Sequence, residues 1–278
     1  MKKKIKLGLL IDPNRKIHEW ENKLFNQIKN SKYCEIRAIF YEPIKIKKKN
    51  FFKRNIFNSS LNLFIKIIEK KFRTTKNERN FSFESIPKVK IYAKKKLYSD
   101  YFSAKDVQKI KRFNLDVILR RDFRILKGDI LKSANYGIWS LHHGDNDFIR
   151  GIPPGFWETY YNLPLTGVTL QKINTVLDGG DIIEKGFYGT KFFWKHNESF
   201  IKEKSIQLVL KNLKLLYFNK KIKYQKSKKN LNTIYYKNPK FYNLAIYILK
   251  KYPYFILKKL FRFLLPINLF INKWKICK

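Results

Sequence analysis

Residues 137–183, GIWSLHHGDNDFIRGIPPGFWETYYNLPLTGVTLQKINTVLDGGDII, hold the densest group of polar and turn-forming residues in the chain. Two adjacent histidines, an Arg-Gly pair, a Pro-Pro-Gly loop and an Asp-Gly-Gly-Asp turn lie between apolar runs that are typical of strands. The rest of the chain is mostly Lys, Ile, Asn, Phe and Leu. Polar residues gathered between strands in this way indicate a functional site on strand-end loops.

The segments before this stretch alternate between strand and helix patterns. Residues 5–11 predict a buried strand, 17–28 show the three- and four-residue spacing of an amphipathic helix, and 34–40 predict a second strand. Strand, helix and strand in this order form the unit of a parallel sheet. The alternation continues with strands at 89–93, 116–119 and 137–141, a helix from the Ser103–Asp106 capping motif to Phe113, and a short helix at 128–134. We predict a doubly wound α/β fold with a mostly parallel, Rossmann-like sheet.

His142 and His143 follow the predicted strand at 137–141, so they stand at its carboxyl end. In an open parallel sheet, ligands bind beyond this end of the strands. His18 and His196 lack such polar neighbours and are interpreted as structural residues. Asp145 and Asp147 beside His143 are potential metal ligands, so a metal site is an alternative interpretation of this group. Because no second cluster of ligands stands at a suitable spacing, we expect no metal.

The formal net charge of +40 in 278 residues is extreme, and it is unevenly placed. The last carboxylate is Glu203, so 205–278 contains 18 Lys and Arg and no acid. An anionic partner is one interpretation of this excess. A base composition that favours Lys, Asn and Ile codons is the alternative. Cys34 and Cys277 have no metal-ligand spacing and form no disulfide framework, which favours a reducing cytoplasm.

We predict a catalytic domain at 1–218, with a Lys- and Asn-rich insertion at about 44–80 and a basic helical extension at 219–278. The insertion carries one expected helix, 61–72, with Leu63, Phe64, Ile67 and Ile68 on one face. A helix at 197–218 is expected to close the catalytic domain. The extension predicts a linker at 220–230 and amphipathic helices at 241–249 and 254–265. Aromatic and basic residues there favour peripheral membrane contact through 240–272, at the inner face of the membrane. Packing on the catalytic domain or on an oligomer partner is the alternative.

The blocks HHGDNDFIRG, GFWE, TGVT and LDGGDII together resemble the 10-formyltetrahydrofolate-dependent formyltransferases. This family includes methionyl-tRNA, glycinamide ribonucleotide and sugar N-formyltransferases, and its pattern is Asn-x-His-Pro followed by Arg-Gly, Thr-Gly-Val-Thr and Leu-Asp-x-Gly-Asp. The resemblance covers roughly 5–215. It implies transfer of a formyl group from 10-formyltetrahydrofolate, the co-substrate, to a small-molecule primary amine.

Residue roles follow from the resemblance, position by position. It implies His142 and Asp178 as catalytic residues. It also implies folate contacts for Phe123, Arg124, Ile125 and Leu126, and for Val176, Leu177 and Gly179. Arg150 and Gly151 align with the family's Arg-Gly pair, and we expect Arg150, Gly151 and Trp157 to contact the acceptor. Arg150 tying the loop to a strand is the alternative.

Two positions depart from the family pattern. With these two changes the chain resembles a variant branch of the formyltransferase family. Ser140 stands where the family has a catalytic Asn, and His143 stands where it has Pro. Ser140, Asn146 or His143 is expected to supply the oxyanion donor, the alternative being that activity is altered or lost. An amino sugar, as a sugar nucleotide, is the expected acceptor. Methionyl-tRNA is the runner-up, and a non-catalytic folate-binding protein is the third hypothesis.

Overall fold

The computed structural model describes residues 3–43, 56–74, 79–174, 180–226 and 234–253. The chain divides into two compact units. The first contains 1–51 and 69–238, and the second contains 52–68 and 239–278. This division differs from the predicted one. The second unit takes part of the insertion together with the C-terminal segment, and the first unit extends beyond residue 218.

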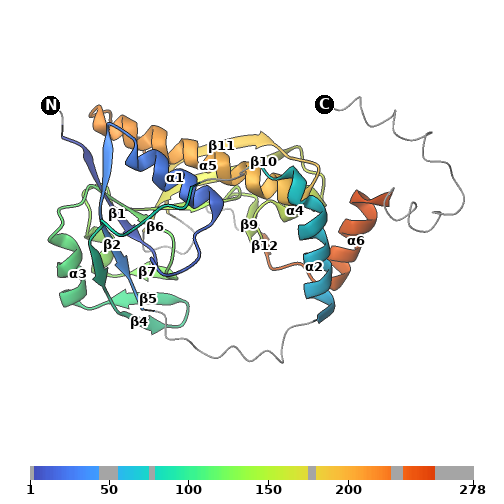
Figure 1. Cartoon of the computed structure of the whole chain (residues 1–278), viewed down its shortest axis with the longest axis horizontal. Helices are drawn as coiled ribbons and strands as arrows, with labels where there is room; N and C mark the ends of the chain where they lie inside the picture. The colour runs from blue at the N-terminus through green and yellow to red at the C-terminus, as the bar shows by residue number, and fades with distance from the viewer. Residues whose placement is uncertain (1–2, 44–55, 75–78, 175–179, 227–233, 254–278) are drawn as a thin grey trace, which may run out of the picture. The chain divides into compact units, whose positions relative to one another are not determined.

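The first unit is built on a sheet that has seven strands among the described residues, in the order β11-β10-β8-β6-β1-β2-β3. Figure 1 labels β11, β10, β6, β1 and β2 of this sheet. The parallel strands are β1 (Ile5–Leu10), β2 (Cys34–Tyr41), β3 (Lys88–Lys90), β6 (Val117–Arg120) and β8 (Ile138–His142). Beyond β8, β10 (Leu165–Lys172) pairs antiparallel with β8, and β11 (Asp181–Gly189) pairs antiparallel with β10. The mostly parallel α/β fold is therefore confirmed.

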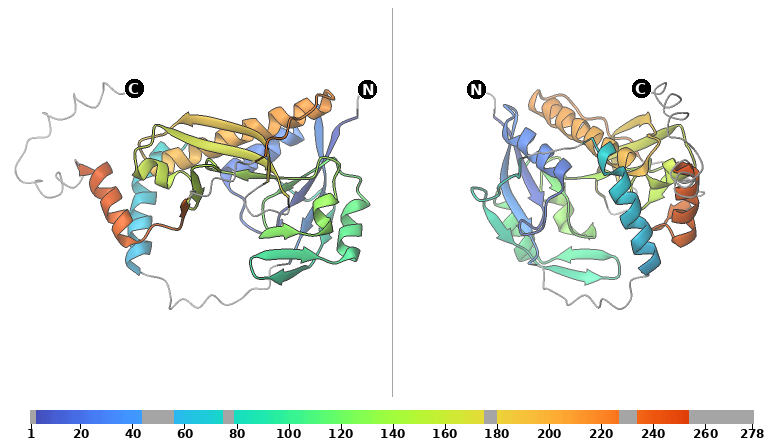
Figure 2. Two further views of the ribbon diagram at one scale, coloured as in Figure 1. Left: turned by 180° about the vertical axis from the view of Figure 1, so that it is seen from behind. Right: turned by 45° about the vertical axis from the view of Figure 1, so that its right-hand side comes forward.

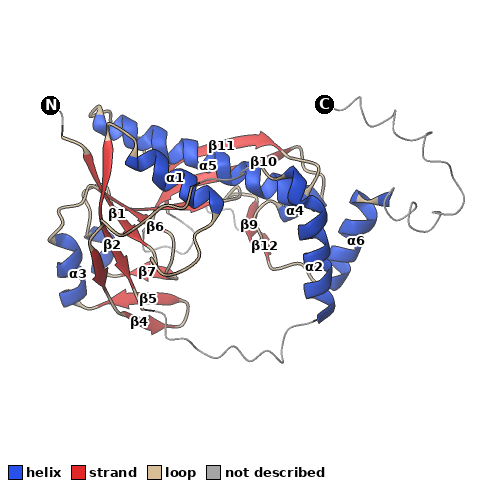
Figure 3. Ribbon diagram, viewed as in Figure 1, coloured by secondary structure: helices blue, strands red, loops and turns tan. Residues whose placement is uncertain are grey.

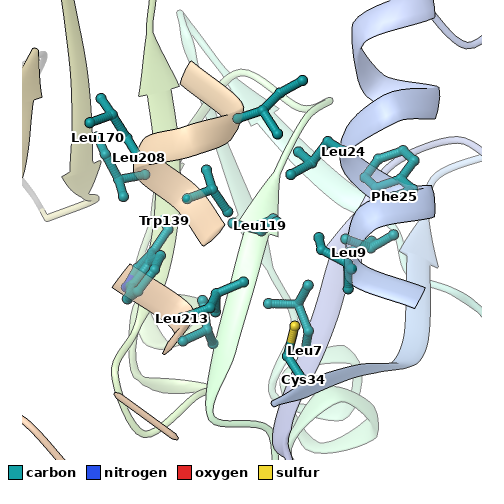
Figure 4. Close-up of a cluster of buried hydrophobic side chains, with 14 of the residues drawn as sticks. Leu7, Leu9, Leu24, Phe25, Cys34, Leu119, Trp139, Leu170, Leu208 and Leu213 are labelled. Carbon is teal, nitrogen blue, oxygen red and sulfur yellow. The ribbon is translucent and has the colours of Figure 1, made fainter. Parts of the chain in front are cut away.

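Helices cover both faces of this sheet (Figure 3). On one face, α1 (Glu19–Lys29) and α5 (Trp194–Tyr217) lie side by side, as the two views of Figure 2 also show. Figure 4 shows the core beneath them, in which leucines of β1 and α5 surround Leu119 and Trp139. On the other face, α3 (Ala104–Lys111) buries Val107 and Ile110 against Ile118 and Ile138. Successive strand residues therefore point to opposite cores.

Smaller elements complete the first unit. The strands β4 (Ala93–Lys96), β5 (Ser99–Phe102) and β7 (Ile125–Lys127) form a separate sheet, and β9 (Ile149–Gly151) pairs with β12 (Ile234–Tyr236). The helix α4 (Phe156–Tyr160) follows Gly155, and two 3₁₀ helices occupy Glu69–Phe72 and Asp129–Lys132. The second unit holds α2 (Ile56–Ile68) and α6 (Phe241–Lys251).

Several sequence predictions are confirmed by these elements and others are wrong. The first βαβ unit, the Ser103 cap, which accepts a hydrogen bond from Asp106 N at 3.1 Å, and the helices at 197–218 and 241–249 are confirmed within a few residues. The strand predicted at 89–93 is right only at its start, because β3 ends at Lys90 and Ala93 begins β4 in a different sheet. The helix predicted at 61–72 begins earlier, at Ile56, and is 3₁₀ from Glu69 onward. The helix predicted at 128–134 is only the short 3₁₀ helix Asp129–Lys132. The helix at 254–265 lies outside the described residues.

Candidate active site

A row of polar residues crosses the carboxyl end of the sheet. Arg120 on β6 pairs with Ser140 on β8, and Ser140 pairs with Gln171 on β10. Residues in register on neighbouring strands point to the same face, here the face that α3 covers further along the strands through Ile118 and Ile138. The apolar core of this face therefore ends in a polar row where the strands reach their loops.

Ser140 is buried and its hydroxyl is held by a cation. The Arg120 guanidinium donates to Ser140 Oγ from Nε at 3.3 Å and from Nη2 at 3.0 Å. A third bond runs from Arg120 Nη1 to the carbonyl oxygen of Arg124 at 2.8 Å. A charge-assisted bond to a buried hydroxyl fixes both partners. The position where the resemblance expects an Asn thus carries a serine joined to an arginine, and the sequence analysis missed that arginine.

His142 lies two residues after Ser140 on the same strand, so its side chain leaves the same face. Its Nε2 stands 3.5 Å from the Ile149 carbonyl oxygen, which belongs to the loop that returns after the strand. A Cβ added at Gly144 would lie 2.9 Å from His142 Nε2 and 2.8 Å from Ile149 O. Glycine at residue 144 therefore lets this loop approach the imidazole closely.

The loop after His142 is tied down by buried polar contacts. Asn146 is buried and donates from Nδ2 to Gln171 Oε1 at 2.8 Å, so it joins the polar row. Lys185 binds Asp145 at 2.7 Å and Asp147 at 2.6 Å. Burial opposes the charge of Lys185, but these two carboxylates raise its pKa. The two aspartates that suggested a metal are therefore ion-pair partners of a lysine. Among the described residues no group of three or more potential ligands could hold a metal ion.

His143 turns to the other face of the sheet. Its Nε2 lies 3.2 Å from Ser205 Oγ on α5, and its ring packs edge-on against Trp20 of α1 with ring centroids 5.3 Å apart. Burial, with the nearby charges of Lys202 and Arg121, holds the pKa of His143 well below its ordinary value. A neutral imidazole engaged with α1 and α5 does not join the polar row, so the structure does not bring His143 to Ser140 and His142.

A cavity of about 620 Å³ opens where β1, β6 and the β4-β5-β7 sheet meet. Phe123 and Arg124 line it, as the resemblance implies for a folate pocket. Phe123 has a φ of 70°, a strained conformation for a bulky residue. Arg124 binds Asp100 through its backbone N at 2.7 Å and through Nε at 3.0 Å. Asp100 itself lines the cavity, and the other lining residues are Asp12, Arg15, Glu42, Lys95 and Asp122.

Other residues with an implied folate contact lie elsewhere. Leu126 is fully buried in the core beneath α3, and Ile125 is half-buried where β7 pairs with β5. Asp178, Val176, Leu177 and Gly179 fall within 175–179, outside the described residues, so their predicted roles stay predictions. Another cavity, of about 500 Å³ at the start of β8, is lined by none of the predicted site residues.

Arg150, Gly151 and Trp157 lie together around the β9–β12 pair. The Arg150 Nε donates to Asn146 O, and its Nη1 donates to Tyr235 Oη at 3.3 Å. The Trp157 ring lies 4.9 Å from that of Tyr236, and its Nε1 donates to Ile152 O. Through its bond to Asn146, Arg150 holds the loop against its own strand, which is the alternative considered from the sequence. Arg150 also lies beside Tyr235, which is half exposed.

No protein-family model matches the chain, and no curated protein matches its sequence. Solved structures do match its fold. Phosphoribosylglycinamide formyltransferase from Anaplasma phagocytophilum superposes with a TM-score of 0.52 at 15% identity, over 85% of this chain and 100% of that one. Glycinamide ribonucleotide transformylase 1 from Symbiobacterium toebii gives 0.51 at 10% identity, over 78% and 89%.

A variant of HypX from Aquifex aeolicus also gives a TM-score of 0.51, at 12% identity, covering 86% of this chain. The chain spans only 30% of the length of HypX. At these identities the likeness concerns the fold. Over the matched share, the chain has the fold of these formyltransferase structures, as the resemblance implied.

Proposed function

We propose that this protein transfers a formyl group from 10-formyltetrahydrofolate to a primary amine. The observation that carries the proposal is the polar row, in which Arg120 donates to Ser140, two residues before His142 on β8, and to the carbonyl oxygen of Arg124, which lines the cavity. A strand-end histidine on the same strand face as a hydroxyl held by an arginine suits the stabilisation of an oxyanion in acyl-type transfer. The proposal also draws on the motif resemblance and on the fold.

Formyl transfer to an amine passes through a tetrahedral carbon that bears an oxyanion. In the proposed mechanism, a protonated His142 donates a hydrogen bond to this oxygen. The Arg120 guanidinium, held by Ser140, adds positive charge at the same place and takes over the role of the family's Asn. Asn146, oriented by Gln171, offers a further amide donor on the loop. Each such donor is worth about 2.7–4 kcal/mol to the transition state.

The amine must also lose a proton as it attacks, and the bond between the formyl carbon and folate N10 must break, with N10 taking up a proton as tetrahydrofolate leaves. Asp178 is the proposed acceptor of the amine proton, directly or through water, and this role rests on the resemblance alone. The side chain of His143 takes no part in the proposed mechanism, because it is engaged with Ser205 and Trp20.

The cavity fits the folate co-substrate in chemistry and in size. Lys95 pairs with Glu42 at 3.0 Å and Arg15 pairs with Asp122 at 3.0 Å, so the cavity carries both signs of charge. The carboxylates can accept further hydrogen bonds from the amino groups of a flat heterocycle, and the two cations can also attract a carboxylate tail. A volume of about 620 Å³ lies in the usual range for sites that hold a drug-sized ligand. When bound, the folate supplies the activated formyl group. The residues of this chain orient it and stabilise the charge that develops.

An amino sugar carried by a nucleotide is the proposed acceptor. Tyr235 and Tyr161 are each about half exposed near the β9–β12 pair, and the guanidinium carbon of Arg150 lies 5.7 Å from the Tyr235 ring centroid. Exposed tyrosine rings suit a sugar or base, and an arginine suits a phosphate. These features support a sugar nucleotide as a small-molecule substrate.

Release of tetrahydrofolate from 10-formyltetrahydrofolate, measured with amino-sugar nucleotides as acceptors, tests this proposal. Wild-type turnover should fall by about 10²–10³ in His142→Ala and in Arg120→Ala. Arg37→Ala, an exposed arginine in the same unit, is the matched control and should keep full activity. If the protein binds folate but shows no turnover with any amine, the proposed enzymatic function is contradicted. The hypothesis of a non-catalytic folate-binding protein would then remain.

Methionyl-tRNA is the second candidate acceptor, and the net charge of +40 favours it. Binding of a polyanion releases counterions, so affinity for tRNA would fall steeply with salt. The same assay with methionyl-tRNA distinguishes the two candidate acceptors. Turnover with methionyl-tRNA and none with amino-sugar nucleotides would identify tRNA as the acceptor.

The basic extension is proposed to bring the protein to the inner face of a membrane. Of the predicted contact at 240–272, residues 240–253 lie within the described part of the chain. There α6 exposes Tyr242, Ile246 and Leu249. These residues support a peripheral contact.

A further inference from the structure

The second unit is made of two segments that are far apart in sequence and share an unusual charge pattern. Residues 52–68 contain Lys53, Arg54 and Lys66 and no Asp or Glu. Residues 239–278 contain nine Lys and Arg and again no acid. The first unit, in contrast, holds all the acidic residues of the chain. The fold therefore collects two acid-free segments into one body.

Direct contacts join α2 and α6 inside this unit. Phe57 meets Phe241 with ring centroids 6.1 Å apart, and Phe64 meets Tyr252 at 6.5 Å. Asn58 Nδ2 donates to the Pro239 carbonyl oxygen at 3.2 Å. The helix of the insertion and the helix of the C-terminal segment thus form a pair, which the sequence analysis treated as unrelated elements.

The helix pair exposes large apolar side chains in regular stripes. On α6, Tyr242, Ile246 and Leu249 follow one another at spacings of four and three, and Tyr242 and Leu249 are 55% and 60% exposed. On α2, Leu63 and Ile67 are four residues apart and are 56% and 64% exposed. This spacing places each set on one side of its helix. Lys66 and Lys250 are exposed immediately beside these stripes.

We propose that α2 and α6 together form one docking surface for an anionic lipid bilayer. Apolar stripes bordered by lysines, on helices that carry no acid, combine the two attractions of an interfacial helix: burial of apolar side chains and pairing with anionic headgroups. None of the described helices is long and apolar enough to cross a membrane. At 13 and 11 residues, α2 and α6 fit a position in the plane of the interface.

Other occupants fit this surface less well. Single-stranded RNA binds through stacking on aromatic rings, but Tyr242 is the one aromatic residue of the two stripes. The other members, Leu63, Ile67, Ile246 and Leu249, are aliphatic and cannot stack with bases. A second copy of the chain would bring two acid-free basic surfaces together, which like-charge repulsion opposes. The proposal rests on the membrane contact proposed above and deepens it, because it adds α2 to the contact and names anionic lipid as the partner. It is independent of formyl transfer, because lipid binding is measured without any folate or amine.

Sedimentation of the full-length protein with vesicles tests the proposal. Vesicles of phosphatidylcholine with roughly one third phosphatidylglycerol should bind the protein, and phosphatidylcholine alone should bind it far less. The apolar variant Ile67→Asn/Leu249→Asn should lower vesicle partitioning about tenfold. The charge variant Lys66→Glu/Lys250→Glu should lower it by about tenfold or more, and only at low salt.

The matched control changes the same residue types in the first unit. Leu97 is 91% exposed and Lys94 is exposed on the β4–β5 hairpin, so Leu97→Ser/Lys94→Glu should leave partitioning unchanged. Hydrogen exchange of the unaltered protein gives a second readout, because α2 and α6 should become protected when anionic vesicles are added.

Absence of binding to anionic vesicles would overturn the proposal. Binding that survives both helix variants, or protection confined to other elements, would also overturn it, because the contact would then lie elsewhere. Binding of tRNA that the same variants abolish, without vesicle binding, would assign the surface to nucleic acid.

Discussion

Glu158 is a buried carboxyl that makes the stability of this protein depend on pH. The residue lies in α4, only 2% of its surface reaches solvent, and neither carboxyl oxygen has a hydrogen-bond partner among the described residues. Burial raises the pKa of Glu158 from 4.5 to about 7. The Trp157 and Tyr160 rings belong to the same short helix. The folded protein therefore keeps this carboxyl protonated well above the pH at which the unfolded chain ionises.

The sign and size of the effect follow from linkage. A carboxyl whose folded pKa is raised costs nothing below the unfolded pKa of 4.5, and the full cost appears above the folded pKa of about 7. A difference of this size corresponds to about 3 kcal/mol, of which about 2.5 kcal/mol develops between pH 5 and pH 8. Glutamine keeps the shape of the neutral acid and cannot ionise. Glu158→Gln should therefore gain about 2.5 kcal/mol over the wild type between these two pH values.

Urea unfolding at pH 5 and pH 8, followed by tryptophan fluorescence, measures this gain for both proteins. Other titrating groups cancel because only the difference between variant and wild type is used. Glu84→Gln, at an exposed loop position, is the control and should show no gain. An equal difference at both pH values for Glu158→Gln would refute the reasoning, because the carboxyl would then be ionised and hydrated in the folded state.

Three further perturbations follow from the contacts of the site and the core. Arg120→Lys should retain more turnover than Arg120→Ala, because lysine keeps the positive charge, and folate affinity should be unchanged in both variants. An equal loss of turnover in the two variants would mean that the guanidinium has only a structural role. Glu21 is buried with Arg15 and Arg121, which hold its pKa at about 2 against the effect of burial, so its stabilisation is present above pH 4.5 and lost as pH falls through 2. Glu21→Gln should cost about 3 kcal/mol in urea unfolding at pH 7, and a neutral result would contradict the ion-pair reading. Gly151→Ala should open the β9–β12 pair, because its Cβ would lie 1.9 Å from Tyr236 O at a φ of 122°; strain of about 1–3 kcal/mol and faster hydrogen exchange in β12 are expected, and unchanged exchange would speak against it.

Local sequence patterns determined much of the sheet and its helices. Residues close together in sequence favour one type of secondary structure at each of these places. Examples are the apolar run at β1, the spacing of apolar residues in α1 and the Ser103 cap of α3. The position of His142 at the end of β8 follows from the same local reasoning, since a strand prediction also predicts where its carboxyl end lies. The short strands β5, β7, β9 and β12 were missed because three or four residues carry too little periodicity.

Pairing between distant segments was decided only by the tertiary structure. Arg120 meets Ser140 because β6 and β8 adopt one particular register, and a shift of one residue would point Arg120 to the opposite core. His143 and His142 are neighbours in sequence, yet they serve opposite faces because strand side chains alternate.

The second unit makes the same point at a larger scale. Periodicity indicated helices near α2 and at α6 and their apolar faces, but it held no information on the contact between Phe57 and Phe241 across that sequence distance. The sequence by itself therefore determined most of the helices and the central parallel strands, the fold class and the strand-end histidine, whereas β10 and β11 were not predicted as strands. Which side chains meet, and which apolar faces stay uncovered, depended on long-range contacts that no local pattern encodes.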